Sequence, residues 1–129
     1  DAFQDLNHEE LGNPYLLYVG DGEMKWELQQ KHETEGGQVR FLGFQNQTKL
    51  PSFYDLADIF VLPSEREPWG LAVNEVMNCK TAIVVSDKCG CAADLVDSSC
   101  GCIFSAGDKK GLSKALTDLL KKTQNFLEF

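Results

Sequence analysis

The fold is decided by one stretch of the sequence, residues 58–85, which reads DIFVLPSEREPWGLAVNEVMNCKTAIVV. Residues 58–63 form a strongly apolar run that ends at a proline, and residues 82–85 form a second apolar run. Between them lie a loop, Ser64 to Trp69, and an apolar-periodic segment from Gly70 to about Asn78, which predicts a helix. Strands that are apolar at every position are typical of parallel sheets, so this stretch predicts a strand–helix–strand unit with a right-handed crossover.

The rest of the chain continues the same alternation. Short apolar runs predict strands at residues 15–19, 39–42 and 102–104. Predicted helices cover residues 23–33, 50–56 and 92–96, and Thr48 is a candidate N-cap for the second of them. Asp108 is expected to cap a last helix, whose apolar stripe consists of Leu112, Ala115, Leu116, Leu119 and Leu120. We therefore expect an α/β fold, a Rossmann-like parallel sheet with helices on both faces.

The composition narrows the classes of function. The 129 residues, of which 43% are hydrophobic, suit one ordinary domain. Twelve Lys and Arg against 20 Asp and Glu leave a net charge of −8, which argues against a nucleic-acid partner. The longest apolar runs are about five residues, far short of the roughly 20 that span a bilayer. Five cysteines, an odd number, do not suggest a disulfide framework, so we expect a cytoplasmic location.

The loop that follows residues 58–63 is the candidate ligand site, because parallel sheets bind ligands beyond the carboxyl ends of their strands. The first backbone amides of the next helix, at Gly70, Leu71 and Ala72, have no intrahelical partner and can bind an anion. Glu67 and Glu75 flank this position, and ionised carboxylates bind hydroxyl groups. A site that binds both a phosphate and several hydroxyl groups suggests a nucleotide sugar as its ligand. The plainer alternative is that these glutamates are solvated surface charges.

Two other patterns suggest cofactors or metals but fit them poorly. Gly20-x-Gly22 follows a predicted strand, yet Trp26 stands where a dinucleotide fingerprint has its third glycine, so a turn is the better interpretation. The pairs Cys89-x-Cys91 and Cys100-x-Cys102 are spaced more closely than the cysteine pairs of structural zinc sites. We expect the cysteines to fill the core as small apolar side chains, and we expect no metal site.

Several segments in order resemble the C-terminal domain of the retaining GT-B glycosyltransferases of group 1, or family 4. The resemblance covers residues 15 to 120. It rests on LLYVGDGE at residues 16–23, VRFLGF at 39–44, YDLADIFVLPS at 54–64 and EVMNCKTAIVV at 75–85. The Glu-x7-Glu motif of the family is matched in register by Glu67 and Glu75.

This resemblance implies the roles of the site residues. Glu67 would contact hydroxyls of the donor sugar, and Glu75 would contact the ribose diol of the nucleotide. The backbone amides of Gly70, Leu71 and Ala72 would bind the pyrophosphate. Gly43 and Phe44 would approach the nucleobase. The family needs no metal or other cofactor for this step.

The resemblance also implies an organisation. Residues 1–129 would be a single donor-binding domain that lacks its first strand, with the following helix retained in residues 2–6, and lacks the N-terminal acceptor domain. The full-length enzyme would transfer a hexose from a nucleoside-diphosphate sugar to a hydroxyl of a glycan, lipid or small molecule, with retention, in glycan biosynthesis. The fragment alone would be nearly inactive. For the full-length protein, the surface of a membrane is a further possible location.

The sequence departs from the family pattern at Pro68, Lys80 and Ala82, where the family usually has a small residue, glycine and proline. Pro68 and Lys80 favour an alternative, a non-catalytic Rossmann-like binding or interaction module. A second alternative is another GT-B enzyme that acts on phosphorylated sugars, such as an epimerase or a phosphorylase.

Overall fold

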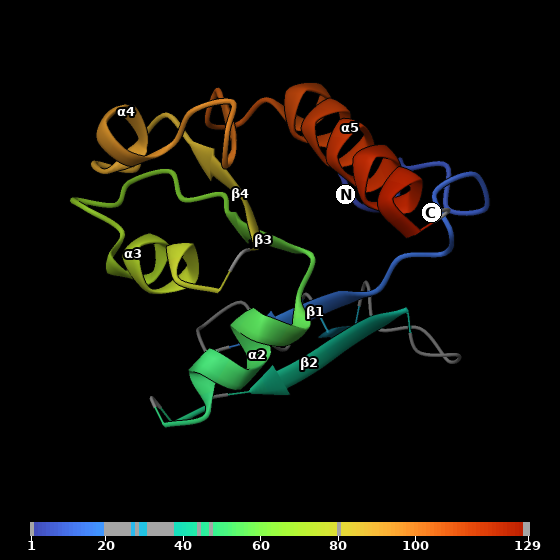
Figure 1. The fold of residues 1–129 in the computed structure, drawn as a ribbon, viewed down its shortest axis with the longest axis horizontal. Coiled ribbons are helices and arrows are strands. Elements are labelled where there is room, and N and C mark those ends of the chain that lie inside the picture. Colours follow the sequence, from blue (N-terminus) through green and yellow to red (C-terminus); the bar gives the residue numbers. More distant parts are fainter. Residues whose placement is uncertain are drawn as a thin grey trace.

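The computed structural model describes residues 2–19, 27, 29–30, 38–43, 45–46, 48–79 and 81–127. Strands and helices alternate along the chain from β2 onward, as predicted (Figure 1). The elements are β1 (Leu16–Val19), β2 (Val39–Gly43), α2 (Leu50–Leu56), β3 (Ile59–Leu62), α3 (Leu71–Met77), β4 (Ala82–Ser86), α4 (Ala92–Leu95), β5 (Gly101–Phe104) and α5 (Lys109–Leu127). The turn predicted at 20–22 and Lys80 lie outside the described residues, as does most of the helix predicted at 23–33.

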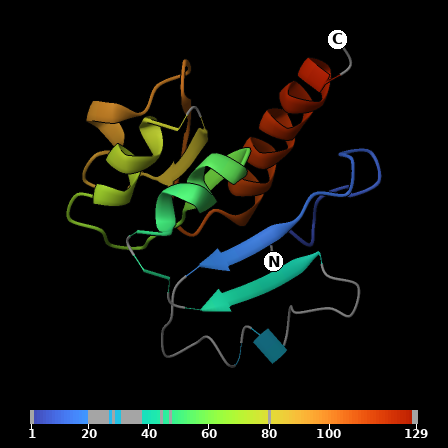
Figure 2. The same ribbon diagram turned by 60° about the horizontal axis from the view of Figure 1, so that its bottom comes forward.

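The strands form two parallel sheets within the described part of the chain. One sheet pairs β1 with β2, and the other has the order β3-β4-β5. Figure 2 shows β1 and β2 side by side, with the helices beyond them. The βαβ unit predicted from residues 58–85 is present, because β3 and β4 pair in parallel with Ile59 opposite Ala82 and Leu62 opposite Val85.

The core lies on both faces of the three-stranded sheet. Its central strand, β4, is inaccessible to solvent from Ile83 to Ser86. Ile83 and Val85 pack with side chains of α2, α3 and α4, whereas Val84 packs with side chains of α5. Figure 1 shows α3 and α4 on one side of β4 and α5 on the other. The prediction of helices on both faces is therefore confirmed.

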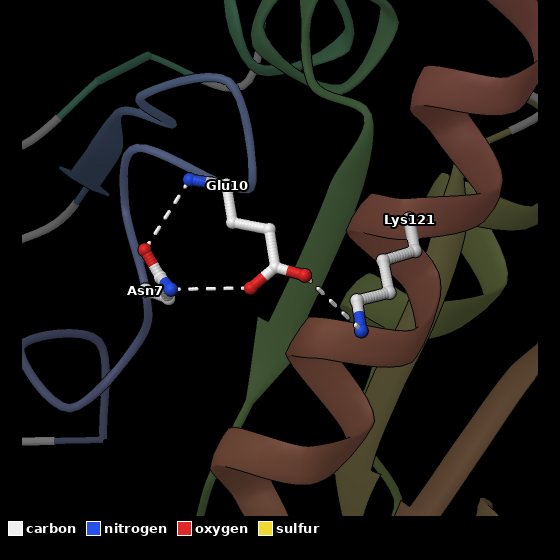
Figure 3. A network of polar contacts seen from close by, with 3 residues as sticks. All are labelled: Asn7, Glu10 and Lys121. Carbon is white, nitrogen blue, oxygen red and sulfur yellow. Dashed lines mark hydrogen bonds and ion pairs between the residues drawn. The ribbon is translucent and has the colours of Figure 1, made fainter.

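The N-terminal segment, residues 2–13, packs against α5 instead of forming the short helix expected at residues 2–6. It consists of turns, and Leu6 and Leu11 are buried beside Leu116 of α5. An ion pair joins the same two segments, with the Glu10 carboxylate 3.9 Å from Lys121 Nζ, and Asn7 Nδ2 of the N-terminal segment donates to Glu10 Oε2 (3.1 Å; Figure 3). Apolar packing against α5 explains why this segment follows the helix surface.

The two predicted helix caps have different outcomes. Asp108 caps α5 as expected, because its Oδ1 accepts a hydrogen bond from the backbone N–H of Gly111 (3.0 Å). Thr48 does not cap α2, since the N-cap is Lys49 and makes no side-chain cap bond. Pro51 stands in the first turn of α2, where its fixed φ favours a helix start and its missing N–H needs no cap. Among the described helices, none has the length and hydropathy needed to cross a membrane.

Candidate active site

The β3–α3 loop, residues 63–70, is held against the loop that follows β4. Glu67 donates its backbone N–H to the carbonyl of Lys88 (3.2 Å), and the carbonyl of Glu67 accepts from the N–H of Gly90 (2.9 Å). One step further along, the N–H of Cys91 donates to the carbonyl of Trp69 (2.9 Å). This ladder of hydrogen bonds joins the carboxyl-end loops of two neighbouring parallel strands, so it fixes the backbone that carries Glu67.

Two glycines allow these loops to approach closely. A Cβ on Gly90 would lie 1.8 Å from the carbonyl oxygen of Pro68, so no larger residue fits there without moving the backbone. Gly70 is the N-cap of α3 and has a φ of +92°, which glycine adopts without strain. A Cβ on Gly70 would also lie 3.2 Å from the sulfur of buried Cys91. The path of the loop into α3 therefore depends on both glycines.

The first turn of α3 presents backbone amides, as the sequence predicts. The first hydrogen bond of this turn runs from the N–H of Val73 to the carbonyl of Gly70 (3.0 Å). The N–H groups of Leu71 and Ala72 have no acceptor among the residues that the structure describes. Such amides at the start of a helix can donate to an anion.

Glu67 lies beside this turn. Its side chain is half-buried, and its Cγ is 3.6 Å from the position that a Cβ would take on Gly70. The structure therefore places the side chain of Glu67 beside Gly70, the residue that precedes α3. The neighbouring Glu65, in contrast, is exposed.

Glu75 lies in the second turn of α3 and contacts a residue that sequence reasoning did not assign to the site. Tyr54 of α2 donates its hydroxyl to Glu75 Oε2 (3.3 Å). Burial, and then the Glu75 carboxylate, raise the pKa of Tyr54, so the hydroxyl keeps its proton at neutral pH. The two residues are 21 positions apart on different helices, and no spacing in the sequence indicates their contact.

Ser86 is a second residue that sequence reasoning missed. Its buried hydroxyl donates to the carbonyl of Ser64 and accepts from the N–H of Lys88 (3.3 Å). It thereby fastens the start of the β3–α3 loop to the end of β4. The sequence did contain a sign of this contact, a polar residue directly after the apolar run of residues 82–85. A hydroxyl buried at the end of a strand needs a hydrogen-bond partner.

Of the two residues expected near a nucleobase, Gly43 and Phe44, the structure describes only Gly43. Gly43 ends β2, in the two-stranded sheet, with a φ of +68°. It pairs with Val19 across an irregular register. Phe44 lies outside the described residues. The structure thus assembles Glu67, the amides of α3 and Glu75 in one region, and their relation to the end of β2 remains a prediction.

The cysteines fill the core, as expected. All five are free thiols, and Cys89 and Cys91 are buried among apolar side chains of the sheet and helices. Cys79, Cys100 and Cys102 pack against the edges of the two apolar clusters. Burial is the main cause that raises the pKa of Cys91, so its thiol stays protonated beneath Gly70.

Comparison with known proteins identifies the family. The family model described as glycosyl transferases group 1 matches residues 1–127. The chain is 32% identical over 91 residues to D-inositol 3-phosphate glycosyltransferase 2 of Catenulispora acidiphila, which covers 70% of this chain and 21% of that protein. It is 31% identical over 108 residues to a glycogen synthase of Mycobacterium tuberculosis, covering 81% of this chain and 26% of that protein.

Solved structures agree in fold. WaaG, a glycosyltransferase involved in lipopolysaccharide biosynthesis, matches with a TM-score of 0.79 at 21% identity, covering 95% of this chain and 33% of that one. Anabaena Alr3699/HepE in complex with UDP-glucose matches with a TM-score of 0.79 at 26% identity, covering 96% of this chain and 35% of that one. This chain spans between about a fifth and a third of the length of these relatives. With this Rossmann-like fold and its GT-B structural neighbours, the chain belongs to the group 1 glycosyltransferases.

Proposed function

We propose that this chain is the C-terminal, donor-binding domain of a retaining GT-B glycosyltransferase of family 4. The observation that carries the proposal is the arrangement at the carboxyl end of β3, where Glu67 lies beside Gly70 and the N–H groups of Leu71 and Ala72 have no acceptor in the described part of the chain, with Glu75 one turn further along α3. The neighbour Alr3699/HepE has been solved with UDP and with UDP-glucose, which supports a nucleotide sugar as the ligand. The proposed reaction transfers a hexose to an acceptor hydroxyl with retention of configuration.

In this proposal each group of the site has one task. The amides of Gly70, Leu71 and Ala72 donate to the pyrophosphate and stabilise the charge that grows on it as the sugar leaves. Glu67 accepts hydrogen bonds from hydroxyls of the donor sugar and holds the sugar for attack. Glu75 accepts from the ribose diol, and Gly43 and Phe44 approach the nucleobase. These groups perform the step without a metal or other cofactor.

The acceptor belongs to the other half of the proposed enzyme. A glycan, a lipid or a small molecule would bind to an N-terminal domain that this chain does not contain, and the reaction would take place between the two domains. The isolated chain is therefore expected to be nearly inactive. We place the enzyme in the cytoplasm, in glycan biosynthesis, with the membrane surface as the alternative location for the full-length protein.

The proposed role of Glu67 is tested in the full-length enzyme by comparing Glu67→Ala with Glu65→Ala. Loss of a hydrogen bond from a charged group costs about 1.5–3 kcal/mol, so Glu67→Ala should lower turnover by roughly ten- to 150-fold. Glu65 is exposed on the same loop, two residues away, and its replacement should leave turnover unchanged. Equal rates for wild type and Glu67→Ala would remove Glu67 from the site.

Products distinguish the proposed reaction from its alternatives. The wild-type enzyme is incubated with UDP-, GDP- and ADP-hexoses and an acceptor mixture, and the anomeric configuration of the product is read by NMR. A product with the configuration of the donor supports retention, and an inverted product contradicts it. If no nucleotide sugar binds or reacts, the non-catalytic module replaces the transferase as the explanation.

A further inference from the structure

Glu75 depends on one neighbour for its position. It is exposed on α3, and an exposed glutamate has several rotamers of similar energy. Within the described part of the chain, its carboxylate has one side-chain partner, the hydroxyl of Tyr54 at 3.3 Å from Oε2. A contact between two helices thus selects the orientation of this carboxylate.

Tyr54 is held in place by its own contacts, so its hydroxyl can fix the orientation of the Glu75 carboxylate. It is 9% exposed, and its ring packs edge-on against Phe60 of β3, with centroids 5.8 Å apart. Its backbone carbonyl accepts a hydrogen bond from the buried hydroxyl of Thr81 (2.7 Å), at the entry to β4. The side chain and the backbone of Tyr54 are therefore both tied to the three-stranded sheet.

The hydrogen bond leaves most of the carboxylate available. An ionised carboxylate has two oxygens and about four acceptor positions, of which Tyr54 occupies one on Oε2. Oε1 and the second position of Oε2 remain for a ligand. Two adjacent hydroxyls, each donating one hydrogen bond, match this pair of positions, whereas a single hydroxyl uses only one.

We propose that Tyr54 is a positioning residue that orients Glu75 toward a vicinal diol, so that the site selects ribonucleotides over 2′-deoxyribonucleotides. This inference rests on the proposed function, because it concerns the nucleotide of the donor. Tyr54 itself touches no ligand in this account. It acts by holding Glu75 in the one rotamer that accepts both ribose hydroxyls.

The test measures the affinity of the full-length protein for UDP, GDP and ADP and for their 2′-deoxy forms by titration calorimetry. Five proteins are compared: wild type, Tyr54→Phe, Glu75→Gln, the double variant and the control Tyr15→Phe. Tyr54→Phe keeps the ring and its packing on Phe60, and removes only the hydroxyl. Tyr15→Phe is the matched control, because Tyr15 is 70% exposed.

The preference for the ribonucleotide is the decisive readout, since general loosening of the fold would weaken both forms equally. In the wild type, the ribonucleotide should bind at least tenfold tighter than its 2′-deoxy form. Tyr54→Phe should reduce this ratio by roughly two- to tenfold, the range of one net hydrogen bond. The double variant should show no further reduction beyond Glu75→Gln, and Tyr15→Phe should match the wild type.

The possible negative results distinguish failure of this inference from failure of the proposed function. If Glu75→Gln lowers the ratio and Tyr54→Phe leaves it unchanged, the positioning role of Tyr54 is wrong and the proposed donor site stands. If the wild type has no preference for the ribonucleotide, or Glu75→Gln keeps the full preference, both the ribose role of Glu75 and this inference are overturned. If the wild type binds no nucleotide, the proposed function itself fails.

Discussion

Replacing Gly90 by alanine should displace the β3–α3 loop. The added Cβ would lie 1.8 Å from the carbonyl oxygen of Pro68 and 3.1 Å from Cα of Trp69, both of them backbone atoms. Relief of this overlap requires a shift of more than about 1 Å, and misplacement on that scale can cost a hundredfold in rate. The shift also strains the hydrogen bonds from the N–H groups of Gly90 and Cys91 to the loop. Two such bonds contribute about 1–3 kcal/mol to the free energy of unfolding.

Gly90→Ala should therefore lower both stability and donor binding. We expect the free energy of unfolding to fall by about 1–3 kcal/mol, and the affinity for a nucleoside diphosphate to fall by roughly ten- to 100-fold, the range expected for loss of one hydrogen bond to a charged group. Urea unfolding and titration calorimetry measure the two effects.

Two glycine variants serve as controls. Gly101→Ala creates a similar overlap, 1.7 Å from the carbonyl oxygen of Ile83, but between β4 and β5, away from the loop. It should lower stability with little effect on binding by the folded protein. Gly107→Ala meets no atom within 4 Å and carries only the strain of its φ of +83°, about 1 kcal/mol. Unchanged binding by Gly90→Ala would refute the idea that this close approach shapes the site.

Two further predictions concern stability. Asp108→Ala removes the cap of α5 and should lower the free energy of unfolding by about 1 kcal/mol in urea titrations, whereas Asp108→Asn should keep most of it; equal losses in both would contradict the cap. Hydrogen bonds from the hydroxyl and the N–H of Ser99 hold the pKa of Asp97 below its ordinary value of 3.8. The contribution of the ionised Asp97 to the free energy of unfolding is therefore complete above pH 3.8 and is lost as the pH falls through the pKa of the folded state. The difference in free energy of unfolding between wild type and Asp97→Asn should accordingly narrow in acid. A difference that is independent of pH would oppose this assignment.

Most of the fold could be predicted because the strands are short runs that are apolar at nearly every position. A run such as residues 82–85 has no alternation of polar and apolar side chains, and this pattern favours a parallel sheet between two helical layers. The stripe of α5 was equally clear, since its apolar residues recur at helical spacing, at Leu112, Ala115, Leu116, Leu119 and Leu120, and Ala115 and Leu116 are buried. Local patterns therefore located the described strands and helices α2, α3 and α4 to within one or two residues and placed the start of α5, whereas turns replace the helix expected at residues 2–6.

The site could be predicted only in part, because its supporting contacts join distant segments. Glu67 and the amides after Gly70 follow one another along the chain, so their proximity is visible in the sequence. The hydroxyl of Tyr54 donates to Glu75 from another helix, and the hydroxyl of Ser86 donates to the carbonyl of Ser64 between the ends of β4 and β3. Such contacts depend on how α2 and β4 pack, which no local pattern specifies.

The central claim is that the start of α3 binds the pyrophosphate of a nucleotide sugar between Glu67 and Glu75. A crystal structure of the full-length protein with its tightest-binding nucleoside diphosphate tests it most directly. The account predicts pyrophosphate oxygens about 2.7–3.2 Å from the amide nitrogens of Leu71 and Ala72, with both ribose hydroxyls on the carboxylate of Glu75. A nucleotide bound elsewhere, or a pyrophosphate held without these amides, would contradict it.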